Sequence, residues 1–439
     1  MTTAARLSAA VARLASAVAP VVGFVRPDLG REIAGRAGAA EALCAWGGPG
    51  DGRPLVWLHG ASAGELLGAV PAMRALAAAR AHALLVTHFS PSGRAAIPHL
   101  APAHASAPPL DTAADLDRVF ATLRPALLAF AKLDVWPGMV AAARKAGVPT
   151  ALINGVVRAG SRRSRPLARR LLGPVYADLD RVGAATETDA RRLRGLGVRA
   201  EALEVTGDAA YDLALARADA AAAAGGAGER LGAALPARPP SGARLVAGST
   251  WPRDEAALLE ALGGGGPGLR WQIVLAPHRP TPIRVREILA RCAAAGRPAV
   301  RWSELAAAHA AGRGTSGVPA HAAIVLDEMG FLAELYTLAD AAWVGGGLGP
   351  DGLHNPLEPA AAGVPLLVGP RYERSDAAAL VAAGGAVPCP PDELAGRLVA
   401  WLDAAARESV GERARAVVVE GAGAGAAGAR LLLAAWDAG

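Results

Sequence analysis

The sequence predicts an α/β protein built from two doubly wound halves, each a parallel sheet with helices on both faces. Three observations carry this prediction. Short apolar runs alternate with longer helical patterns along most of the chain, which is typical of βαβ units. The runs are apolar throughout rather than alternating with polar residues, as expected of strands buried on both faces. A stretch rich in Ala, Gly and Pro, residues 214–242, divides this pattern into two parts of similar size.

The composition fits large folded domains and narrows the range of partners. Of the 439 residues, 52% are hydrophobic and 19% are charged, which excludes a disordered chain. The cysteines Cys44, Cys292 and Cys389 are too far apart for a disulfide framework or a CxxC metal site, which favours a reducing compartment. The net charge is +6, and Lys132 and Lys145 are the only lysines. A basic chain favours an anionic partner: nucleic acid, a phosphorylated substrate or a membrane face.

Residues 1–30 are expected to form a membrane-associated helix. The stretch 7–25 is apolar but interrupted by an arginine, and its uncharged part is shorter than the roughly 20 residues that a spanning helix needs. A helix lying on the membrane surface fits the flanking arginines, and a helix packed on its own domain is the alternative. The arginines in question are Arg6, Arg13, Arg26 and Arg31.

The N-terminal half is predicted to span residues 31–213. Its strands are apolar runs that end at glycine-rich or polar turns, which is where strands stop. The run Leu55–His59 precedes a glycine-rich turn, and Ala151–Asn154 precedes an arginine-rich helix. The predicted strands are 55–59, 83–87, 126–131, 151–154 and 181–185. The predicted helices are 65–80, 161–173 and 187–196.

Residues 214–242 are predicted to be an interdomain linker with some helix in it, and residues 243–439 the second half, whose last helix can pack back on the first. Two doubly wound halves place ligands in the cleft between them, facing the carboxyl ends of the strands. The predicted strands are 245–248, 271–276, 298–302, 323–326, 341–345 and 364–368. The predicted helices are 253–262, 282–295, 330–338 and 356–362.

Several nucleotide- and metal-binding motifs are absent from the sequence. No GxGxxG follows the first strand and no GxxxxGK[ST] occurs, so a nicotinamide Rossmann enzyme is disfavoured and a P-loop NTPase is excluded. There is no HExxH, and the nine histidines lack metal-ligand spacing. We therefore expect no bound metal.

The turn 59–65 after the first strand is a candidate catalytic loop. Its small residues let a ligand approach the backbone, and Glu65 lies at the start of the following helix. A carboxylate in this position suits a general base that takes the proton of a hydroxyl acceptor. The alternative is that Glu65 complements the helix dipole.

The segment 345–359 is a candidate anion site. A strand ends at a run of three glycines, and Asn355 is expected to cap the next helix, with Glu358 three residues later as in a capping box. Free backbone N–H groups at such a helix start attract phosphate. His354, directly before the cap, is expected to contact the ligand.

Two further turns follow strands at the same edge of the second half. Ser249 and Thr250 offer hydroxyls, and His278 and Arg279 offer ring nitrogens and a guanidinium, a group that pairs well with phosphate. An arginine run in the first half is either a solvated helix face or a site for an anionic lipid. Nucleic acid is disfavoured because few aromatic residues are interleaved. The run comprises Arg162, Arg163, Arg165, Arg169 and Arg170.

These motifs, in this order, resemble the Kdo (3-deoxy-D-manno-octulosonic acid) transferases of lipopolysaccharide synthesis, a family with the two-domain GT-B glycosyltransferase fold. The matches cover most of residues 55–370, and HNPLEP with its preceding glycines and the SAGE turn are the specific ones. The matching segments are WLHGASAGE (57–65), THFSPSG (87–93), DVWP (134–137), ING with its arginine-rich continuation (153–170), TETDARRLRGLG (186–197), TGD (206–208), GSTWP (248–252), APHRP (276–280), DEMGFLAELYTLADAAWVGGGL (327–348) and HNPLEP (354–359).

The resemblance implies an inverting, metal-independent glycosyltransferase without a cofactor, with Glu65 as catalytic base, CMP-Kdo as donor and a lipid A precursor as acceptor. It implies a peripheral or monotopic protein on the cytoplasmic side of the cell inner membrane. The implied donor-binding residues are Ser249, Thr250, His278, Arg279, Met329, Gly330, Gly346, Gly347, His354, Asn355 and Glu358. The implied acceptor-binding residues are Ser62, Gly64, Asp134, Arg158, Arg162 and Arg163.

The sequence departs from the family pattern at three places. Lys132 stands where the family usually has an acidic residue, the pair His278-Arg279 reverses the usual order, and three residues rather than one separate Asn154 from Arg158. A GT-B paralogue with another nucleotide sugar or acceptor is therefore an alternative, as is a non-catalytic membrane-associated binding protein that keeps the fold.

Overall fold

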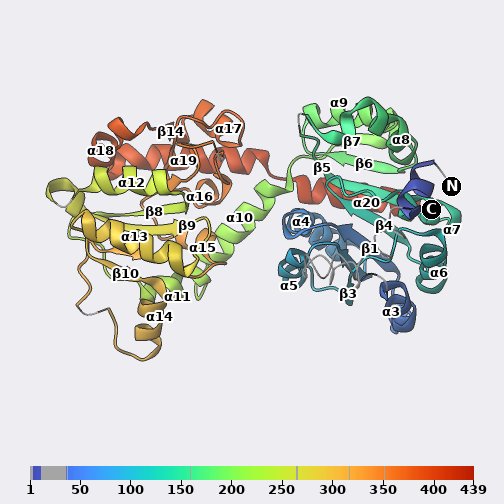
Figure 1. Ribbon diagram of the computed structural model, residues 1–439, viewed down its shortest axis with the longest axis horizontal. Helices are drawn as coiled ribbons and strands as arrows, with labels where there is room; N and C mark the ends of the chain where they lie inside the picture. The colour runs from blue at the N-terminus through green and yellow to red at the C-terminus, as the bar shows by residue number, and fades with distance from the viewer. Residues whose placement is uncertain are drawn as a thin grey trace. The chain divides into compact units, whose positions relative to one another are not determined.

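The computed structural model describes residues 3–10, 36, 38–158, 160–263, 265–315, 317–350 and 352–439. Most of the predicted membrane helix 7–25 lies outside the described residues. Residues 3–10 are helical, with Ala4, Ala5 and Ala9 buried. The chain forms two compact units: unit 1 comprises residues 1–213 and 421–439, and unit 2 comprises residues 214–420 (Figure 1).

Unit 1 contains a seven-stranded parallel sheet with the order β3-β2-β1-β4-β5-β6-β7. The central strand β1 pairs with β2 and β4, so that Leu58 lies opposite Val86 and Ala129. The chain adds strands outward from β1 in one direction and then continues from β4 in the other, and the order reverses between β1 and β4. The strands are β1 (Leu55–Gly60), β2 (Ala83–His88), β3 (His104–Ser106), β4 (Leu127–Ala131), β5 (Thr150–Gly155), β6 (Arg181–Ala184) and β7 (Leu203–Val205).

Both faces of this sheet are buried. Trp57 belongs to one core, which α3, α6, α7, α8 and α9 complete, and its neighbour Leu58 belongs to the opposite core, which α4 and α20 complete. Burial on both faces explains why the strands are apolar without alternation. The helices are α3 (Ala39–Trp46), α4 (Ala63–Ala79), α5 (Ile97–Leu100), α6 (Ala113–Leu123), α7 (Pro137–Ala146), α8 (Pro166–Ala177), α9 (Glu187–Leu196) and α20 (Ala424–Asp437), with 3₁₀ turns η1 (Pro91–Ala96), η2 (Arg162–Ser164) and η3 (Ala200–Ala202).

Unit 2 contains a second seven-stranded parallel sheet, with the order β10-β11-β9-β8-β12-β13-β14. Its order reverses between β8 and β12, and Trp343 and Val246 belong to the two cores on its opposite faces. The strands are β8 (Ala243–Thr250), β9 (Trp271–Pro277), β10 (Ala299–Arg301), β11 (Ala323–Val325), β12 (Ala341–Val344), β13 (Leu366–Val368) and β14 (Ala386–Pro388). The helices are α11 (Ala227–Ala234), α12 (Pro252–Leu262), α13 (Pro282–Ala294), α14 (Trp302–Ala310), α15 (Leu332–Tyr336), α16 (Leu357–Ala361), α17 (Ala377–Ala382), α18 (Pro391–Ala400) and α19 (Ala404–Gly421), with η4 (Gly266–Arg270).

The start of unit 2 differs from the predicted domain boundary, whereas the end of unit 2 agrees with the expectation that the last helix can pack back on the first half. The predicted linker 214–242 is part of unit 2: it holds the end of α10 (Ala209–Ala222) and α11, and buries Ala234 and Leu235 in the core. Alanine favours helix and is small enough to pack, so low complexity did not mean a flexible chain. At the other end, residues 421–439 leave unit 2 and belong to unit 1.

Helix α20 packs against α4 and against β5 and β6 of unit 1. Its glycines let the helices approach closely: a Cβ at Gly425 would lie 2.7 Å from Pro71 Cβ, and one at Gly428 would lie 2.9 Å from Ala72 Cβ. The stretch Ala404–Asp437 is long and apolar enough to cross a membrane by composition. Since Leu431 and Leu432 of α20 are buried in the core of unit 1, this apolarity has a structural cause within the fold.

Two local predictions are corrected. The arginine-rich helix predicted over 161–173 is split into η2 and α8, because Pro166 starts a new helix and disfavours helical backbone at Arg165. The strands β3, β7 and β14 were not predicted. Each is a three-residue strand at the edge of its sheet. Their sequences, His-Ala-Ser, Leu-Glu-Val and Ala-Val-Pro, contain polar residues or a proline and so show no continuous apolar run.

Candidate active site

The reversal points of the two sheets mark where ligands are expected. In open α/β sheets, ligands bind outside the carboxyl ends of the strands where the strand order reverses. In unit 1 these are the ends of β1 and β4, which lead to Glu65 and to Lys132–Asp134. In unit 2 they are the ends of β8 and β12, which lead to Ser249 and to the glycines at 345–347. Topology therefore selects the same loops as the sequence.

Glu65 is the third residue of α4, which Ser62 precedes as N-cap. The Glu65 Oε2 atom accepts a hydrogen bond from the Ala61 N–H at 2.6 Å, so the carboxylate is folded back over the turn that follows β1. The side chain is half-buried. Burial raises the pKa of Glu65, an effect that the Ala61 hydrogen bond opposes and the charge of Asp134 reinforces. A carboxylate with a raised pKa is a better proton acceptor than a free glutamate.

A pocket of about 660 Å³ opens beside Glu65. It brings together five of the residues predicted for catalysis and acceptor binding and adds Lys132, which the prediction did not include. Its basic side chains come from the loops after β4 and β5. The lining residues are Ser62, Gly64, Glu65, Lys132, Leu133, Val156, Arg158, Gly160, Ser161 and Arg163. Arg162 is exposed on η2 and does not line this pocket.

Asp134 does not line the pocket either, and belongs to a buried polar chain behind it. Its Oδ2 atom accepts hydrogen bonds from His59 Nε2 and from Trp136 Nε1, both at 3.0 Å. Burial opposes ionisation of Asp134, but these hydrogen bonds and the nearby His59 outweigh it, and the pKa of Asp134 is lowered. Asp134 is therefore a charged positioning group rather than a direct contact in the pocket.

Both ring nitrogens of His59 lie within hydrogen-bond distance of polar side chains. Thr87 Oγ1 lies 2.9 Å from both Trp57 Nε1 and His59 Nδ1. The indole N–H can only donate to the hydroxyl, so the hydroxyl hydrogen is available for His59 Nδ1 and the Nε2–H donates to Asp134. The His59 side chain is fully buried. This chain links the ends of β1, β2 and β4.

In unit 2, an aromatic stack joins the loops after β8, β9 and β12. The rings of His278 and His354 lie 4.4 Å apart and nearly parallel, and Trp251 stacks on His278 at 5.1 Å. Trp251 Nε1 also donates to His354 Nε2 at 3.0 Å. His354 thus has a structural role, contrary to the expectation that only a ligand would explain it. Trp251 was not predicted as a site residue.

Asp254 is a second site residue that the prediction missed. Its carboxylate accepts hydrogen bonds from the Trp251 N–H at 2.8 Å, the Gly346 N–H at 3.1 Å and Trp343 Nε1 at 3.2 Å. It is almost fully buried and ties the start of α12 to the glycine turn. The spacing from Trp251 to Asp254 is that of a capping box, and this was the signal available in the sequence.

The glycine turn after β12 is shaped by backbone packing. A Cβ at Gly346 would lie 2.1 Å from the Gly352 carbonyl oxygen, and one at Gly347 would lie 2.8 Å from the Gly369 nitrogen. Glycine is therefore required at these positions by neighbouring loops, with or without a ligand. The adjacent Ser249 has a φ of 52°, a left-handed conformation that is strained in a non-glycine residue.

The remaining predicted donor-site residues differ in whether their side chains are available to a ligand. The Thr250 hydroxyl is buried and donates to Glu255 at 3.0 Å, so it is not available to a ligand. Arg279 is exposed, and the described residues give its side chain no ion pair. Met329 and Gly330 are exposed in the loop after β11.

The predicted capping box at α16 is wrong in one of its two parts. Asn355 Oδ1 accepts the Leu357 N–H at 3.0 Å, as a cap does. Glu358 instead accepts a hydrogen bond from Arg217 Nη1 at 2.9 Å, and Arg217 also pairs with Glu334 at 3.0 Å. A charged guanidinium is a stronger partner for a carboxylate than a backbone N–H. Arg217 belongs to α10 and lies within the predicted linker 214–242.

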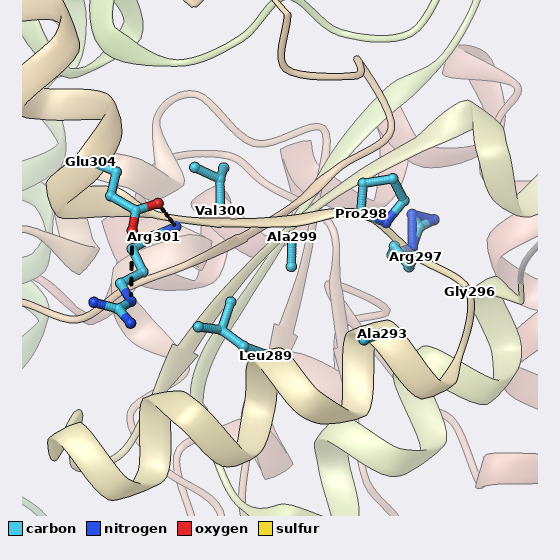
Figure 2. A pocket seen from close by; sticks show the side chains of 9 residues that line it. All are labelled: Leu289, Ala293, Gly296, Arg297, Pro298, Ala299, Val300, Arg301 and Glu304. Atoms are coloured by element: carbon cyan, nitrogen blue, oxygen red, sulfur yellow. Dashed lines mark hydrogen bonds and ion pairs between the residues drawn. The ribbon is translucent and has the colours of Figure 1, made fainter.

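A groove between the end of α13 and the edge strand β10 lies apart from these loops (Figure 2). Its volume is about 540 Å³. Arg301 pairs with Glu304, and the Arg297 guanidinium donates to backbone carbonyls, at 2.8 Å to His321. The Arg301 Nε atom is buried and makes no hydrogen bond in the part of the chain that the structure describes, since its distance to Glu304 Oε1 is 3.8 Å. No predicted site residue lines this groove. Within the described residues, no cluster of His, Cys, Asp or Glu is placed to hold a metal ion.

Comparison with known proteins connects this geometry to a family. A family profile described as 3-deoxy-D-manno-octulosonic-acid transferase (kdotransferase) matches residues 31–213. The 3-deoxy-D-manno-octulosonic acid transferase of Bordetella pertussis is 33% identical over 386 residues, which cover 84% of each chain. The chain belongs to this family of Kdo transferases.

Further comparisons agree. The 3-deoxy-D-manno-octulosonic acid transferase of Chlamydia pneumoniae is 30% identical over 331 residues, which cover 73% of this chain and 70% of the relative. The crystal structure of UDP-GlcNAc 2-epimerase from Neisseria meningitidis bound to UDP-GlcNAc matches with a TM-score of 0.54 at 14% identity, over 84% of this chain and 99% of that chain. At this identity the likeness shows the fold alone, and it confirms the predicted GT-B α/β class. Membership of the Kdo transferase family confirms that the protein is a glycosyltransferase.

Proposed function

We propose that the protein transfers Kdo from CMP-Kdo to a lipid A precursor in lipopolysaccharide core biosynthesis, with inversion at the anomeric carbon and without a metal ion or cofactor. The observation that carries the proposal is the position of Glu65. It is a half-buried carboxylate with a raised pKa, at the reversal point of the unit 1 sheet and beside a pocket lined by basic residues.

The acceptor is assigned to the unit 1 pocket. The acceptor hydroxyl oxygen attacks the anomeric carbon of the donor while Glu65 takes the hydroxyl proton. The bond between that carbon and the CMP phosphate oxygen breaks, and its electron pair leaves with CMP. General-base catalysis of this kind contributes about 10²–10⁴-fold to the rate. Arg158 and Arg163 bind anionic groups of the acceptor, and Arg162 adds positive charge on the adjoining surface.

The donor is assigned to the loops of unit 2. Arg279 is an exposed guanidinium next to the Trp251–His278–His354 stack and is placed to pair with the nucleotide phosphate. Gly347 and Asn355 supply backbone groups, whereas the Gly346 N–H is held by Asp254. Since CMP departs as a phosphate anion, stabilisation of that charge replaces a general acid.

Product analysis tests the reaction. The purified chain, incubated with CMP-Kdo and a tetraacyl lipid A precursor in the presence of EDTA, should add the mass of Kdo to the acceptor, as measured by mass spectrometry. Glu65→Gln serves as the matched inactive control. Transfer from another nucleotide sugar but not from CMP-Kdo would instead assign the protein to a paralogue with a different donor. Loss of activity with EDTA that Mg²⁺ restores would contradict metal independence.

The location at the cytoplasmic face of the inner membrane is part of the proposal. Its support is the apolar, arginine-flanked sequence 7–25 together with the basic exposed surface of η2 and α8. The full chain should sediment with membranes and be released by high salt with detergent. Removal of residues 1–26 should give a chain that no longer sediments but still modifies a detergent-dispersed acceptor. A full chain that stays in the supernatant at low salt would contradict this location.

A further inference from the structure

The pocket beside Glu65 has an excess of positive charge. Lys132, Arg158 and Arg163 line it with a single carboxylate, that of Glu65. Within the described part of the chain, no ion pair joins any of these three cations to an acidic side chain. Arg163 interacts with Asp134 only as a nearby charge. Cations in a concave site that lack a bonded counter-charge attract anions.

The backbone holds Lys132 at this pocket in a strained conformation. Its φ is 57°, in the left-handed region that long side chains seldom adopt. Its N–H donates to the Ile153 carbonyl at 2.9 Å and so fixes it at the end of β4 next to β5. Strained residues of this kind concentrate where ligands bind. The strain therefore marks position 132 independently of its charge.

The path of the Lys132 side chain brings it to the helix face that carries Glu65. A Cβ added at Gly68 would lie 3.6 Å from Lys132 Cε, so the stem runs past Gly68 in α4. Gly68 is nearly one turn after Glu65, and residues three apart share a helix face. The Lys132 charge also acts on Glu65. The ammonium thus lies on the same side of the pocket as the proposed base.

The Asn154 side chain lies next to Gly68 and carries a hydrogen-bond acceptor without a partner among the described residues. Its φ is 52° and its exposed fraction is 6%, and its Oδ1 atom has no hydrogen-bond partner within the described residues. Its Nδ2 atom lies 2.8 Å from where a Cβ at Gly68 would be. An ammonium carries three donors, so Lys132 can serve this buried oxygen and still bind a ligand.

We propose that Lys132 determines acceptor specificity: together with Arg158 and Arg163 it forms a subsite for an oxyanion, a phosphate or carboxylate, that the acceptor carries near its reacting hydroxyl. The proposal rests on the proposed function for the role of Glu65. A lysine supplies a compact positive charge and the arginines supply paired donors. A lysine at position 132 attracts this oxyanion, whereas an acidic side chain at the same position would repel it.

A chemical-protection experiment tests the subsite on the full wild-type chain, because Lys132 and Lys145 are its only lysines. Lys145 is an exposed internal control whose side chain is paired with Asp117. Acetylation rates of both lysines are measured by mass spectrometry with N-acetylglucosamine 6-phosphate, glucuronate, N-acetylglucosamine or inorganic phosphate. A sugar phosphate or sugar carboxylate at ten times its dissociation constant should slow acetylation of Lys132 about tenfold, with Lys145 unchanged.

The outcomes separate the sources of the anion. Protection of Lys132 by the anionic sugars and not by the neutral sugar supports the subsite. Phosphate and carboxylate sugars are compared to identify which oxyanion it prefers. If inorganic phosphate protects Lys132 as well as the anionic sugars do, the site binds free phosphate. This result overturns the assignment to the acceptor. No protection by any anion, or equal slowing at Lys145, overturns the subsite.

Kinetics test the specificity role. At a pH well above the acid limb of the rate profile, Lys132→Met should raise KM for an anionic acceptor by about tenfold to a hundredfold with a much smaller change in kcat. The rise in KM should be absent for the same acceptor without its oxyanion. Lys132→Arg should restore most of the affinity, and Lys145→Met is the matched control. An equal rise in KM for both acceptors overturns the role. Should Lys132→Met fail to fold, the protection experiment decides alone. Absence of transfer from CMP-Kdo by the wild type would refute the proposed function and leave the protection result valid.

Discussion

Glu65 combines a structural and a proposed chemical role in one carboxylate. It complements the start of α4 and accepts the Ala61 N–H, and it faces a pocket lined by basic residues. Burial raises its pKa, which makes the carboxylate a better proton acceptor. Substitutions at this residue can separate the two roles, because helix-dipole effects are small and general-base effects are large.

Glu65→Gln is expected to lower kcat by about 10²–10⁴-fold, because the amide keeps the hydrogen bond to Ala61 but cannot take a proton. Its free energy of unfolding should change by only a few tenths of a kcal/mol. Steady-state kinetics and denaturant unfolding measure the two quantities. A variant with nearly wild-type kcat would remove Glu65 from the mechanism.

The pH dependence of kcat/KM should report the ionisation of Glu65. Its raised pKa means that the carboxylate, the active form, is lost as pH falls through a value above that of a free glutamate. Asp134 raises this pKa and Lys132 lowers it. The acid limb of the profile should therefore move to lower pH in Asp134→Asn and to higher pH in Lys132→Met. A limb that stays in place in both variants belongs to another group.

At the scale of single elements, the site depends on strand ends and helix starts that fix one another. Asp254 at the start of α12 holds the glycine turn after β12, and Asp134 after β4 holds His59 of β1. Each carboxylate lies near a strand end and reaches the neighbouring loop. Most of these partners are distant in sequence, so helix and strand patterns predict the loops but not the hydrogen bonds between them.

Gly248, near the end of β8, should be intolerant of any side chain. An added Cβ would lie 1.9 Å from the Tyr336 hydroxyl oxygen, so Gly248→Ala should lower the free energy of unfolding by about 1–3 kcal/mol. Tyr336→Phe removes that oxygen and should restore part of the loss in the double variant, since Tyr336 Cζ remains 2.9 Å away. Denaturant unfolding of the four chains measures the coupling.

Gly396→Ala is the control for this cycle. Gly396 lies within α18 and an added Cβ would meet nothing within 4 Å, so this change should be neutral or stabilising by up to about 1 kcal/mol. If Gly248→Ala lowers the free energy of unfolding by the same amount in the wild type and in Tyr336→Phe, the tyrosine oxygen is not the cause of the loss.

At the scale of the whole molecule, the chain returns to its first unit at its end. Residues 421–439 belong to unit 1 although residues 214–420 form unit 2. Leu431, Leu432 and Ala435 of α20 are buried in the core that α4 shares. Unit 1 is therefore completed by residues 421–439, which follow unit 2 in the chain, whereas unit 2 is continuous in sequence.

A chain that ends at Glu420 should lose the structure of unit 1 and keep that of unit 2. Removing α20 uncovers one face of β4, β5 and β6, and each buried leucine contributes about 1.5–3 kcal/mol. Hydrogen exchange should show lost protection in β1, β4 and β5 and retained protection in β8 and β9. A chain shortened only by residues 438 and 439, which follow α20, is the control. Retained protection in unit 1 would contradict this dependence.

The sequence by itself determined the α/β class, most strands and the loops of the candidate site. Buried parallel strands are apolar without alternation, and small residues at strand ends are visible as turns. Glu65, Arg158 and Arg163, which the sequence singles out, line one pocket, because the ends of adjacent parallel strands lie at one edge of the sheet.

Only the tertiary structure decided which of these residues contact one another and which core the terminal helix fills. The left-handed backbone of Lys132, the partner of Glu358 and the stack of Trp251 on His278 depend on segments far apart in sequence. The sequence left open that a last helix packs back on the first half, and the place of α20 against α4 follows from the close approach at Gly425 and Gly428. Local sequence patterns indicate which residues are buried, and close packing of the folded chain decides which elements cover them.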